Sequence, residues 1–472
     1  MTFLVHRWLG IVLALLMAIW AISGITMMYV SFPETTAEER LAGLAPLDLS
    51  GCCDRVLLPP TSIERAQVEM IAGQPSLRWS GADGSGIVSL GQTAFPQVTE
   101  REAGLVAATY MQRAFGAAPA TQVQAIDRDQ WTVYGRFRAH QPLYKVSFAD
   151  DRGTVLYVSS LTGEVLQDTT SHERFWNWLG AVPHWLYFTA FREIQPLWYN
   201  FVVYASVLGV FLTVTGIYVG LVMYGKGRRK SPFRGLALWH HWTGLIFGLV
   251  TLTWVFSGLA SMQPWGWLES PGPGKEVEAL AGREVQWSDL EALYRALAAR
   301  PQPGVVSAEL SIQDGRPWAI LARADGSRVR ASLPDLAPAP LAPDELAGIA
   351  ARARPGAPVL SQGLITQGDA YHYSHHNEAR LPAWRLIYAG EDETRFYFDP
   401  YTGELVNFAD APSRAFRWWH YGLHRLDFPV LRQRPLWDVV VVPLVVGVSL
   451  LCAIGVWLGV RRLRRSSARR SR

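Results

Sequence analysis

Four of the eleven histidines fall into two matched pairs along the chain. His6 and His240 each begin the pattern His-x-Trp-x-Gly, and His184 and His424 each begin His-x-Leu-x-Phe. Neutral imidazoles are the usual protein ligands of haem iron, and two facing histidines fill both axial positions of a b-type haem. These sets, which we name the 6/240 pair and the 184/424 pair, therefore predict two non-covalently bound, bis-histidine b-type haems.

Glycines accompany both pairs where a flat ligand would need room. Gly10 and Gly244 follow the histidines of the 6/240 pair by one helical turn, on the same helix face. Gly24 and Gly258 are expected level with the 184/424 pair. Further glycines recur at four-residue spacing in the other apolar segments, namely Gly216, Gly220, Gly455 and Gly459. Such glycines also let helices pack closely, so a packing role and a cofactor role both stay open.

The remaining histidines have less defined roles. His241 is an alternative to His240 as a ligand, although the internal match favours His240. His172 and His420 lack a matched partner, and we expect them to flank the 184/424 pair, as ligands or at the entrance for an electron acceptor. A His-rich stretch is interpreted either as a polar surface loop or as a site for a metal or metal chelate, and it contains His372, His375 and His376.

Arginines near the apolar segments are candidates to pair with haem propionates, or are ordinary interfacial cations. They are Arg7, Arg174, Arg228, Arg229 and Arg425.

Several other chemistries are excluded. Three cysteines cannot build a disulfide framework, and the neighbours Cys52 and Cys53 are expected to be unpaired or locally oxidised. No Cys-x-x-Cys-His is present, which excludes a covalently attached c-type haem. No P-loop, dinucleotide fingerprint, zinc-protease or serine-hydrolase motif occurs. The electron donor must therefore be a separate cytoplasmic protein or a membrane quinol, and no nucleic-acid partner is expected.

The elements that must position these histidines are membrane spans. Charged residues make up only 18% of the chain, below the roughly 25% of soluble domains. Since a helix needs about 20 apolar residues to cross a bilayer, four segments qualify: Trp8–Val30, Trp198–Tyr224, Leu238–Met262 and Trp437–Val460. The first is interpreted as an uncleaved anchor rather than a signal peptide, because its apolar run is long.

Charge sets the expected orientation. No Asp or Glu precedes Glu34 or lies between Tyr199 and Gln263, and the loop 225–237 and tail 461–472 are strongly basic. The positive-inside rule places both in the cytoplasm, together with the N-terminus. The chain then divides into 1–33 with the first span, an outer domain 34–197, a span 198–224, the loop 225–237, a span 238–262, an outer domain 263–434, a span 435–460 and the tail 461–472. The expected location is a bacterial inner membrane, with both outer domains in the periplasm.

The outer domains are expected to be α+β. Capping-box patterns predict helices that begin at Thr61, Thr99 and Ser288. Alternating or β-rich runs predict strands, and these are Trp131–Arg138, Leu143–Phe148, Thr154–Val158, Trp384–Tyr388 and Arg395–Phe398.

The chain uses one unit, span–outer domain–span, twice. The segment that ends in Leu161-Thr-Gly163-Glu164 matches Tyr401-Thr-Gly403-Glu404, and other matches run through all four spans. Both copies enter the membrane in the same orientation, which indicates a pseudo-twofold axis along the membrane normal. The expected fold is a membrane α+β protein, with a four-transmembrane-helix bundle and two periplasmic α+β domains.

The motifs resemble the PepSY-associated transmembrane proteins. The resemblance rests on the segments His6–Gly10, Thr215–Tyr218, Trp239–Gly244, Tyr397–Glu404 and Gly422–Phe428, and it covers nearly the whole chain. It implies PepSY-type periplasmic domains on a four-helix bundle. The best-understood members of this family are bis-haem inner-membrane reductases of ferric siderophores.

The expected function is therefore a haem-dependent transmembrane oxidoreductase that reduces a periplasmic ferric siderophore or another iron chelate. An alternative of a different class is a membrane-anchored PepSY module that serves for binding or for protease inhibition and has no redox activity. A transporter of iron or a chelate is a weaker alternative, because the spans lack buried carboxylates and broken helices.

Overall fold

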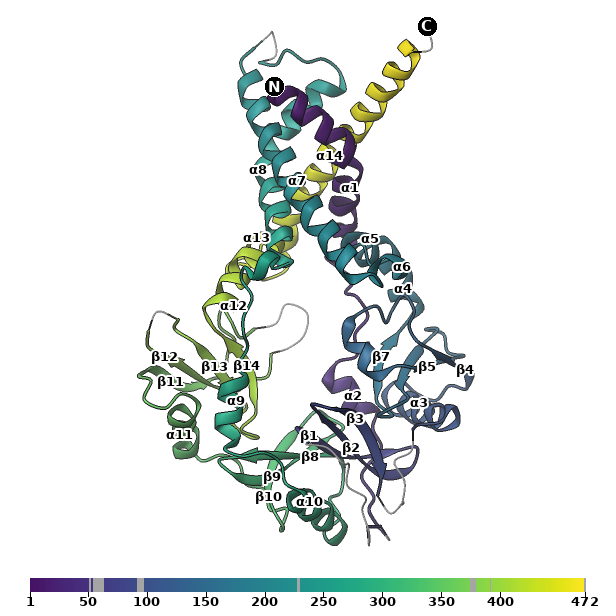
Figure 1. Cartoon of the computed structure of the whole chain (residues 1–472), viewed down its shortest axis with the longest axis vertical. Coiled ribbons are helices and arrows are strands. Elements are labelled where there is room, and N and C mark those ends of the chain that lie inside the picture. Colours follow the sequence, from purple (N-terminus) through teal and green to yellow (C-terminus); the bar gives the residue numbers. More distant parts are fainter. Residues whose placement is uncertain are drawn as a thin grey trace. The chain divides into compact units, whose positions relative to one another are not determined.

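A computed structural model describes residues 1–50, 52–53, 63–90, 97–226, 230–373, 379–390 and 392–470, with only the backbone at 350 and 466–470. The chain forms two compact units (Figure 1). The helical unit comprises Met1–Phe32, Phe175–Ser270 and Ala411–Arg472, and the sheet unit comprises Pro33–Arg174 and Pro271–Asp410. Each of the two long outer segments thus contributes to both units.

Four long helices dominate the helical unit: α1 (Thr2–Met27), α7 (Gln195–Met223), α8 (Leu236–Ser261) and α14 (Leu436–Arg470). All four are long and apolar enough to cross a membrane, as the sequence predicted within a few residues. Helix α1 packs against α7 and α14, and α8 packs against the same two helices. The core between them includes Leu13, Met17, Leu212, Val448 and Cys452.

Short helices and turns precede or follow three of the long helices in the sequence. Before α7 lie α4 (Ser171–Leu179), α5 (Ala181–Trp185) and α6 (Thr189–Arg192). Helix α8 is followed by the 3₁₀ turn η2 (Pro264–Gly266). Before α14 lie α12 (Ala411–Phe416), the π-helical turn η3 (Arg417–Gly422) and α13 (Leu423–Arg425).

The sheet unit contains three antiparallel sheets. One has the order β4-β5-β6-β7, with strands Ala120–Ile126, Leu143–Phe148, Val155–Ser159 and Val165–Thr169. Another has the order β11-β12-β13-β14, with strands Val359–Ile365, Ala383–Tyr388, Arg395–Phe398 and Leu405–Ala409. The strands predicted at 143–148, 154–158, 384–388 and 395–398 are confirmed within one residue.

The third sheet joins strands from both outer segments in the order β10-β9-β8-β1-β2-β3. Its strands are β1 (Arg65–Ile71), β2 (Gln74–Gly81), β3 (Gly84–Ser89), β8 (Val305–Gln313), β9 (Arg316–Arg323) and β10 (Arg328–Ser332). At its centre Val68 of β1 pairs with Ala308 of β8. The two outer segments are therefore held together by main-chain hydrogen bonds.

One helix covers each sheet. Helix α3 (Glu100–Ala114) buries Ala103, Ala107, Tyr110 and Met111 against strands β5–β7, at the spacing of one helix face. Helices α11 (Pro343–Ala353) and α10 (Trp287–Ala299) supply core residues beside the second four-stranded sheet and the six-stranded sheet. The other helical elements of this unit are α2 (Ala37–Gly43), α9 (Gly274–Ala281) and the 3₁₀ helix η1 (Gly135–His140).

Three local predictions need comment. The capping box at Thr99 is confirmed, because the Thr99 hydroxyl accepts from the Glu102 backbone and the Glu102 carboxylate accepts from the Thr99 backbone. The helix predicted from Thr61 is wrong: 61 lies outside the described residues, and Arg65–Ile71 is strand β1. The strand predicted at Trp131–Arg138 is also wrong, since η1 begins there at Gly135.

A carboxylate with the same partners stands beside each four-stranded sheet. Asp129 accepts from the hydroxyl of Tyr157 (2.7 Å) and from Lys145 Nζ (2.8 Å). Asp369, at the matched position, accepts from the hydroxyl of Tyr397 (2.9 Å) and from Arg385 (3.1 Å). These bonds tie the connection between the first two strands of each sheet to its central strands.

A buried carboxylate lies in the six-stranded sheet. Glu69 of β1 is fully buried and lies 2.7 Å from Arg78 and 3.0 Å from Arg40. Ser307 of the neighbouring strand β8 donates its hydroxyl to the same carboxylate at 2.9 Å. Burial acts to raise the pKa of Glu69, but Arg78 and Arg40 outweigh it and hold the pKa at about 2. Glu69 is therefore ionised at neutral pH.

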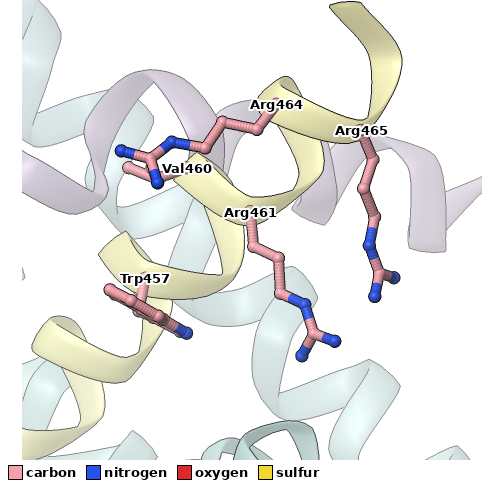
Figure 2. Close-up of a pocket in the computed structure, with 5 residues that line it drawn as sticks. All are labelled: Trp457, Val460, Arg461, Arg464 and Arg465. Atoms are coloured by element: carbon pink, nitrogen blue, oxygen red, sulfur yellow. The ribbon is translucent and has the colours of Figure 1, made fainter. Parts of the chain in front are cut away.

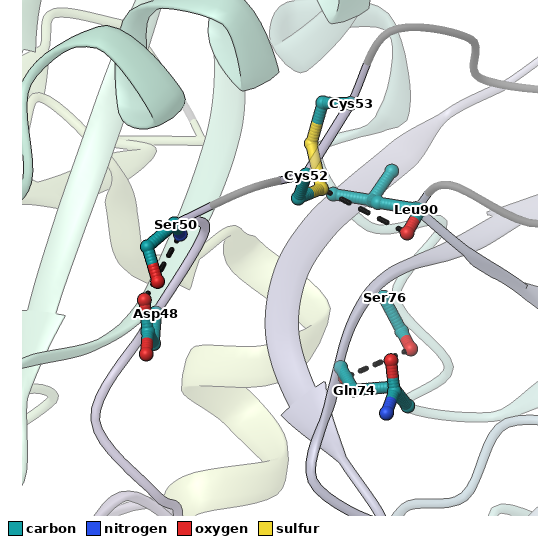
Figure 3. The surroundings of a disulfide bond; sticks show 7 residues. All are labelled: Asp48, Ser50, Cys52, Cys53, Gln74, Ser76 and Leu90. Carbon is teal, nitrogen blue, oxygen red and sulfur yellow. Dashed lines mark hydrogen bonds between the residues drawn. A yellow bond between two sulfur atoms is a disulfide. The ribbon is translucent and has the colours of Figure 1, made fainter.

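Cys52 and Cys53 form a disulfide between sequence neighbours (Figure 3). The Sγ of Cys52 lies 3.7 Å from the carbonyl oxygen of Leu90, a packing contact because a disulfide sulfur carries no proton. Both cysteines pack against the core of the six-stranded sheet. Of the two alternatives that the sequence left open, the structure has the locally oxidised one.

Candidate functional site

The structure brings His6 of α1 and His240 of α8 together. Their ring centroids lie 6.3 Å apart. His6 donates its Nδ1–H to the carbonyl oxygen of Leu212 on α7, at 3.1 Å. The Nδ1 of His240 lies near the carbonyl of Leu451 on α14, the position matched to Leu212, without meeting hydrogen-bond geometry. Each ring thus projects from one long helix toward the backbone of another.

His184 of α5 and His424 of α13 form the second pair, with ring centroids 6.0 Å apart. The Nδ1 of His184 lies 3.0 Å from the carbonyl oxygen of Trp20 on α1, and that of His424 lies 3.2 Å from the carbonyl oxygen of Trp254 on α8. Both short helices end two residues later in the left-handed region, at Leu186 (φ 54°) and Leu426 (φ 50°). The two imidazoles are therefore presented by the same local geometry.

Serine hydroxyls complete the surroundings of this pair. Ser23 Oγ lies 3.2 Å from Nδ1 of His184, and Ser257 Oγ lies 3.0 Å from Nδ1 of His424. Sequence reasoning did not assign these serines a role. The recurrence of Ser-Gly at 23–24 and 257–258 was the signal that could have identified them.

The hydrogen bonds define which nitrogen is available. A carbonyl oxygen only accepts, so Nδ1 of His6, His184 and His424 must carry the proton. In a neutral ring the lone pair then belongs to Nε2, which is how second-shell carbonyls prepare a histidine for a metal. Burial lowers the pKa of His184 to about 4 and that of His424 well below the ordinary value. The rings of His184 and His424, which lie outside the long helices, are thus neutral at pH 7.

Glycines face all four imidazoles, one from each long helix. A methyl group placed on Gly24 or Gly258 would lie 3.7 Å from Cε1 of His184 or His424. A methyl on Gly455 would lie 3.5 Å from Cε1 of His240, and one on Gly216 would lie only 2.7 Å from Cε1 of His6. By the same measure Gly10 and Gly244 face Leu212 and Leu451, at 3.7 and 3.8 Å, rather than the histidines.

His241 is engaged in structural hydrogen bonds on both nitrogens. Its Nδ1 lies 2.9 Å from the hydroxyl of Ser231, and its Nε2 lies 2.8 Å from the carbonyl oxygen of Gly220. The ring is buried. His240 therefore remains the residue of this doublet that faces another histidine.

His420 stands beside the 184/424 pair. Its ring centroid lies 5.2 Å from that of His424, and its Nδ1 lies 3.3 Å from the carbonyl oxygen of Ser257. Burial, together with the positive charge of Arg425, lowers the pKa of His420 to about 4. By the sequence match of His184 with His424, His420 corresponds to Gly180, which lies between α4 and α5. The segment around His420 is instead the π-helical turn η3, so His420 has no histidine counterpart beside His184.

The other polar candidates are dispersed. Arg425 lies with its guanidinium carbon 4.8 Å from the ring centroid of Tyr421, next to His420 and His424. Arg7 is exposed. Arg174 is used in the sheet unit, where it donates to the carbonyl oxygens of Thr169 and Gly153. His172 is exposed at the start of α4 and also belongs to the sheet unit. Residues 228 and 229 lie outside the described residues.

His372 is buried rather than in a surface loop. Its ring stacks on Tyr397 with 4.7 Å between centroids, and its Nε2 donates to the carbonyl oxygen of Arg380 at 2.8 Å. The other two histidines of that stretch, 375 and 376, lie outside the described residues. Among the residues that the structure does describe, no group of three or more His, Cys, Asp and Glu side chains could hold a metal ion.

Comparison with known proteins supplies the family. The profile of the PepSY-associated TM region matches residues 3–306, which include His6, His184 and His240 and three of the four long helices. A search of curated proteins finds no match. Since the matched region is well over half of the sequence, the chain belongs to the PepSY-associated TM region family.

Proposed function

We propose that this protein carries electrons across the bacterial inner membrane through two b-type haems and reduces a ferric complex, such as a ferric siderophore, on the periplasmic side. The 6/240 pair would hold one haem and the 184/424 pair the other. A cytoplasmic protein or a membrane quinol would donate the electrons, with both chain termini in the cytoplasm.

The single observation that carries the proposal is the spacing of the two pairs. A metal–nitrogen bond is about 2 Å long, and the centre of an imidazole lies roughly 1 Å beyond its nitrogen, so two coaxial ligands place their ring centres about 6 Å apart. The measured separations are 6.3 and 6.0 Å. Other rings in contact, such as Tyr224 and Trp242, also lie 6.0 Å apart, so the spacing supports the proposal because both pairs consist of histidines with Nδ1 directed to a helix carbonyl.

The protein's own groups support this use of the histidines. The carbonyls of Leu212, Trp20 and Trp254 accept from Nδ1 and leave Nε2 as the nitrogen that would bind a metal. Neutral, partly buried imidazoles stay available as ligands at physiological pH. When bound, haem supplies one-electron transfer, with a potential set by its axial ligands, burial and nearby charge.

A twofold arrangement of the helices would give the two pairs their common geometry. The long helices contact one another in a closed ring, α1–α7–α8–α14, and corresponding residues make corresponding contacts. For example, the indole of Trp198 donates to the carbonyl of Trp185, and that of Trp437 donates to the carbonyl of Arg425. We therefore include in the proposal a four-helix bundle built from two copies of one unit.

Reduction would release iron from its carrier for a simple chemical reason. Hard oxygen ligands bind Fe(III) more tightly than Fe(II), so one electron delivered to the ferric complex weakens the chelate. Arg425, beside the 184/424 pair, is placed to attract anionic groups there, either haem propionates or a negatively charged chelate.

The visible spectrum of the purified, detergent-solubilised protein tests the proposal. We expect a Soret band and, after dithionite, the sharp α band of a bis-histidine b-type haem, with two haems per chain by the pyridine haemochrome assay. Addition of a ferric chelate to the reduced protein should restore the oxidised spectrum. Absence of these bands after expression with sufficient haem would instead favour a membrane-anchored binding module.

A further inference from the structure

The C-terminal end of α14 carries a groove on its surface (Figure 2). Trp457, Val460, Arg461, Arg464 and Arg465 line it, and its volume is about 350 Å³. The three arginines are exposed, and Trp457 is 55% exposed. Figure 2 shows Arg461 and Arg465 extending to the same side of the helix while Arg464 lies along Val460. A cavity of this size falls at the low end of the range for small-molecule sites.

The arginines have no counter-ion of their own. Among the residues that the structure describes, none of the three makes an ion pair within 4 Å. The sequence contains no Asp or Glu at positions 1–33, 199–263 or 439–472, which include most of the four long helices and this whole end of α14. Within the described part of the chain, no carboxylate side chain therefore neutralises the groove.

The groove faces away from the histidines. Gly455 and Gly459 mark the face of α14 that packs toward His240 and Ile11. Successive residues of a helix are about 100° apart, so Trp457 lies about 200° from Gly455, and Arg461 and Arg464 lie on the side of Trp457. The arginines therefore do not face the space between the histidines.

The position along the helix identifies the partner. The apolar run of α14 ends at Val460, and the arginines follow at once. Tryptophan and arginine at the end of a span lie at the level of the lipid headgroups. A phosphate group accepts paired hydrogen bonds from a guanidinium. Arginines therefore suit a phosphodiester better than they suit an anion that behaves as a single point charge. Zwitterionic headgroups carry a compensating cation, so an anionic lipid fits this groove best.

We propose that Trp457, Arg461, Arg464 and Arg465 form a binding site for the headgroup of an anionic phospholipid. The guanidinium groups hold the phosphate oxygens, and the indole packs against the glycerol and upper acyl region. The site is independent of haem and of the proposed electron transfer, because it occupies the opposite face of the helix.

Thermal unfolding of the full-length protein in a neutral detergent tests the site. Titration with phosphatidylglycerol should raise the midpoint by several degrees, whereas phosphatidylcholine at the same concentrations should not, because a ligand that binds the folded state stabilises it. In the triple variant R461Q/R464Q/R465Q, the concentration of phosphatidylglycerol that gives the same rise in midpoint should increase about tenfold or more, as expected when charged hydrogen bonds are lost.

A matched control removes three cations elsewhere. The variant K226Q/K230Q/R234Q lowers the charge equally but leaves the groove intact, and it should respond to phosphatidylglycerol like the wild type. An equal loss of response in both variants would mean diffuse electrostatic attraction and would overturn the site. A stabilisation by inorganic phosphate as large as that by the lipid would also overturn it, in favour of a small-anion site. The unfolding midpoints in detergent alone show whether each variant folds.

Discussion

His184 is held against helix α1 by a hydrogen bond from its Nδ1 to the carbonyl oxygen of Trp20, 3.0 Å away. That carbonyl belongs to a helix, where the backbone N–H of the residue four positions later normally donates to it. Sharing it with a histidine fixes the ring relative to the helix axis. The equivalent bond from His424 to Trp254 is 3.2 Å long, so two separate helices orient the two rings of this pair.

If this pair binds haem, replacing one member removes a single site. His184→Ala and His424→Ala should each lower the haem content from two to one per chain, because an iron with one remaining protein ligand is held weakly. Pyridine haemochrome assay and the low-temperature α band measure the loss. His172→Ala is the control, since His172 is exposed, and it should keep both haems. Two haems per chain in His184→Ala would disprove the ligand assignment.

The neighbouring histidines 240 and 241 should behave differently. His241→Ala should keep two haems but destabilise the protein by about 1–3 kcal/mol, since it leaves the buried partners Ser231 and Gly220 without their hydrogen bonds. His240→Ala should lose the haem of the 6/240 pair. Haem content and thermal unfolding, measured on both variants, separate the roles. The reverse pattern would make His241 the ligand.

Gly216 is the most restrictive of the glycines beside the histidines. Its added methyl group would lie 2.7 Å from Cε1 and 3.1 Å from Nδ1 of His6, closer than side chains pack, so Gly216→Ala should displace the ring and lower haem content at the 6/240 pair. Gly104→Ala in α3 places its methyl 3.5 Å from Val123 and serves as the control. That variant should keep both haems and gain up to about 1 kcal/mol of helix stability. Unchanged haem in Gly216→Ala would show that His6 is not a ligand in this position.

Glu69 should contribute pH-dependent stability to the sheet unit. Its folded pKa of about 2 lies below the ordinary 4.5. The contribution is therefore complete above about pH 4.5 and is lost as the pH falls through 2. Glu69→Gln should lower the free energy of unfolding by about 3 kcal/mol at pH 7, because Arg40 and Arg78 lose their buried partner. At pH 3 the difference from the wild type should be clearly smaller.

Urea titration of the full-length protein in detergent at both pH values measures this effect. Glu278→Gln, at an exposed position, is the control and should stay within about 0.5 kcal/mol of the wild type. A Glu69→Gln difference that is the same at pH 3 and pH 7 would argue against an ionised Glu69.

The local features of this protein could be predicted from its sequence. Long apolar runs can only be satisfied as helices in a bilayer, so the four spans were predicted within a few residues. Matched motifs identified the paired histidines before any geometry was known, and alternating residues located four strands of the smaller sheets. Failures were local too: Trp131–Arg138 has the composition of a strand, but Trp131 and Thr132 donate hydrogen bonds to Asp129 and the residues from Gly135 onward form η1.

Only the tertiary structure decided how distant residues meet. The sequence around Val68 and Ala308 does not indicate that they pair, because a strand presents the same hydrogen-bonding edge to any partner. Packing of the whole sheet determines that these two strands are neighbours. The proposed preference for His240 over His241 as a ligand likewise rests on the hydroxyl of Ser231 and the carbonyl of Gly220, which bond to the two ring nitrogens of His241. The sequence determined which histidines recur. The separations of 6.3 and 6.0 Å, on which their proposed chemistry rests, exist because helices far apart in the sequence pack together.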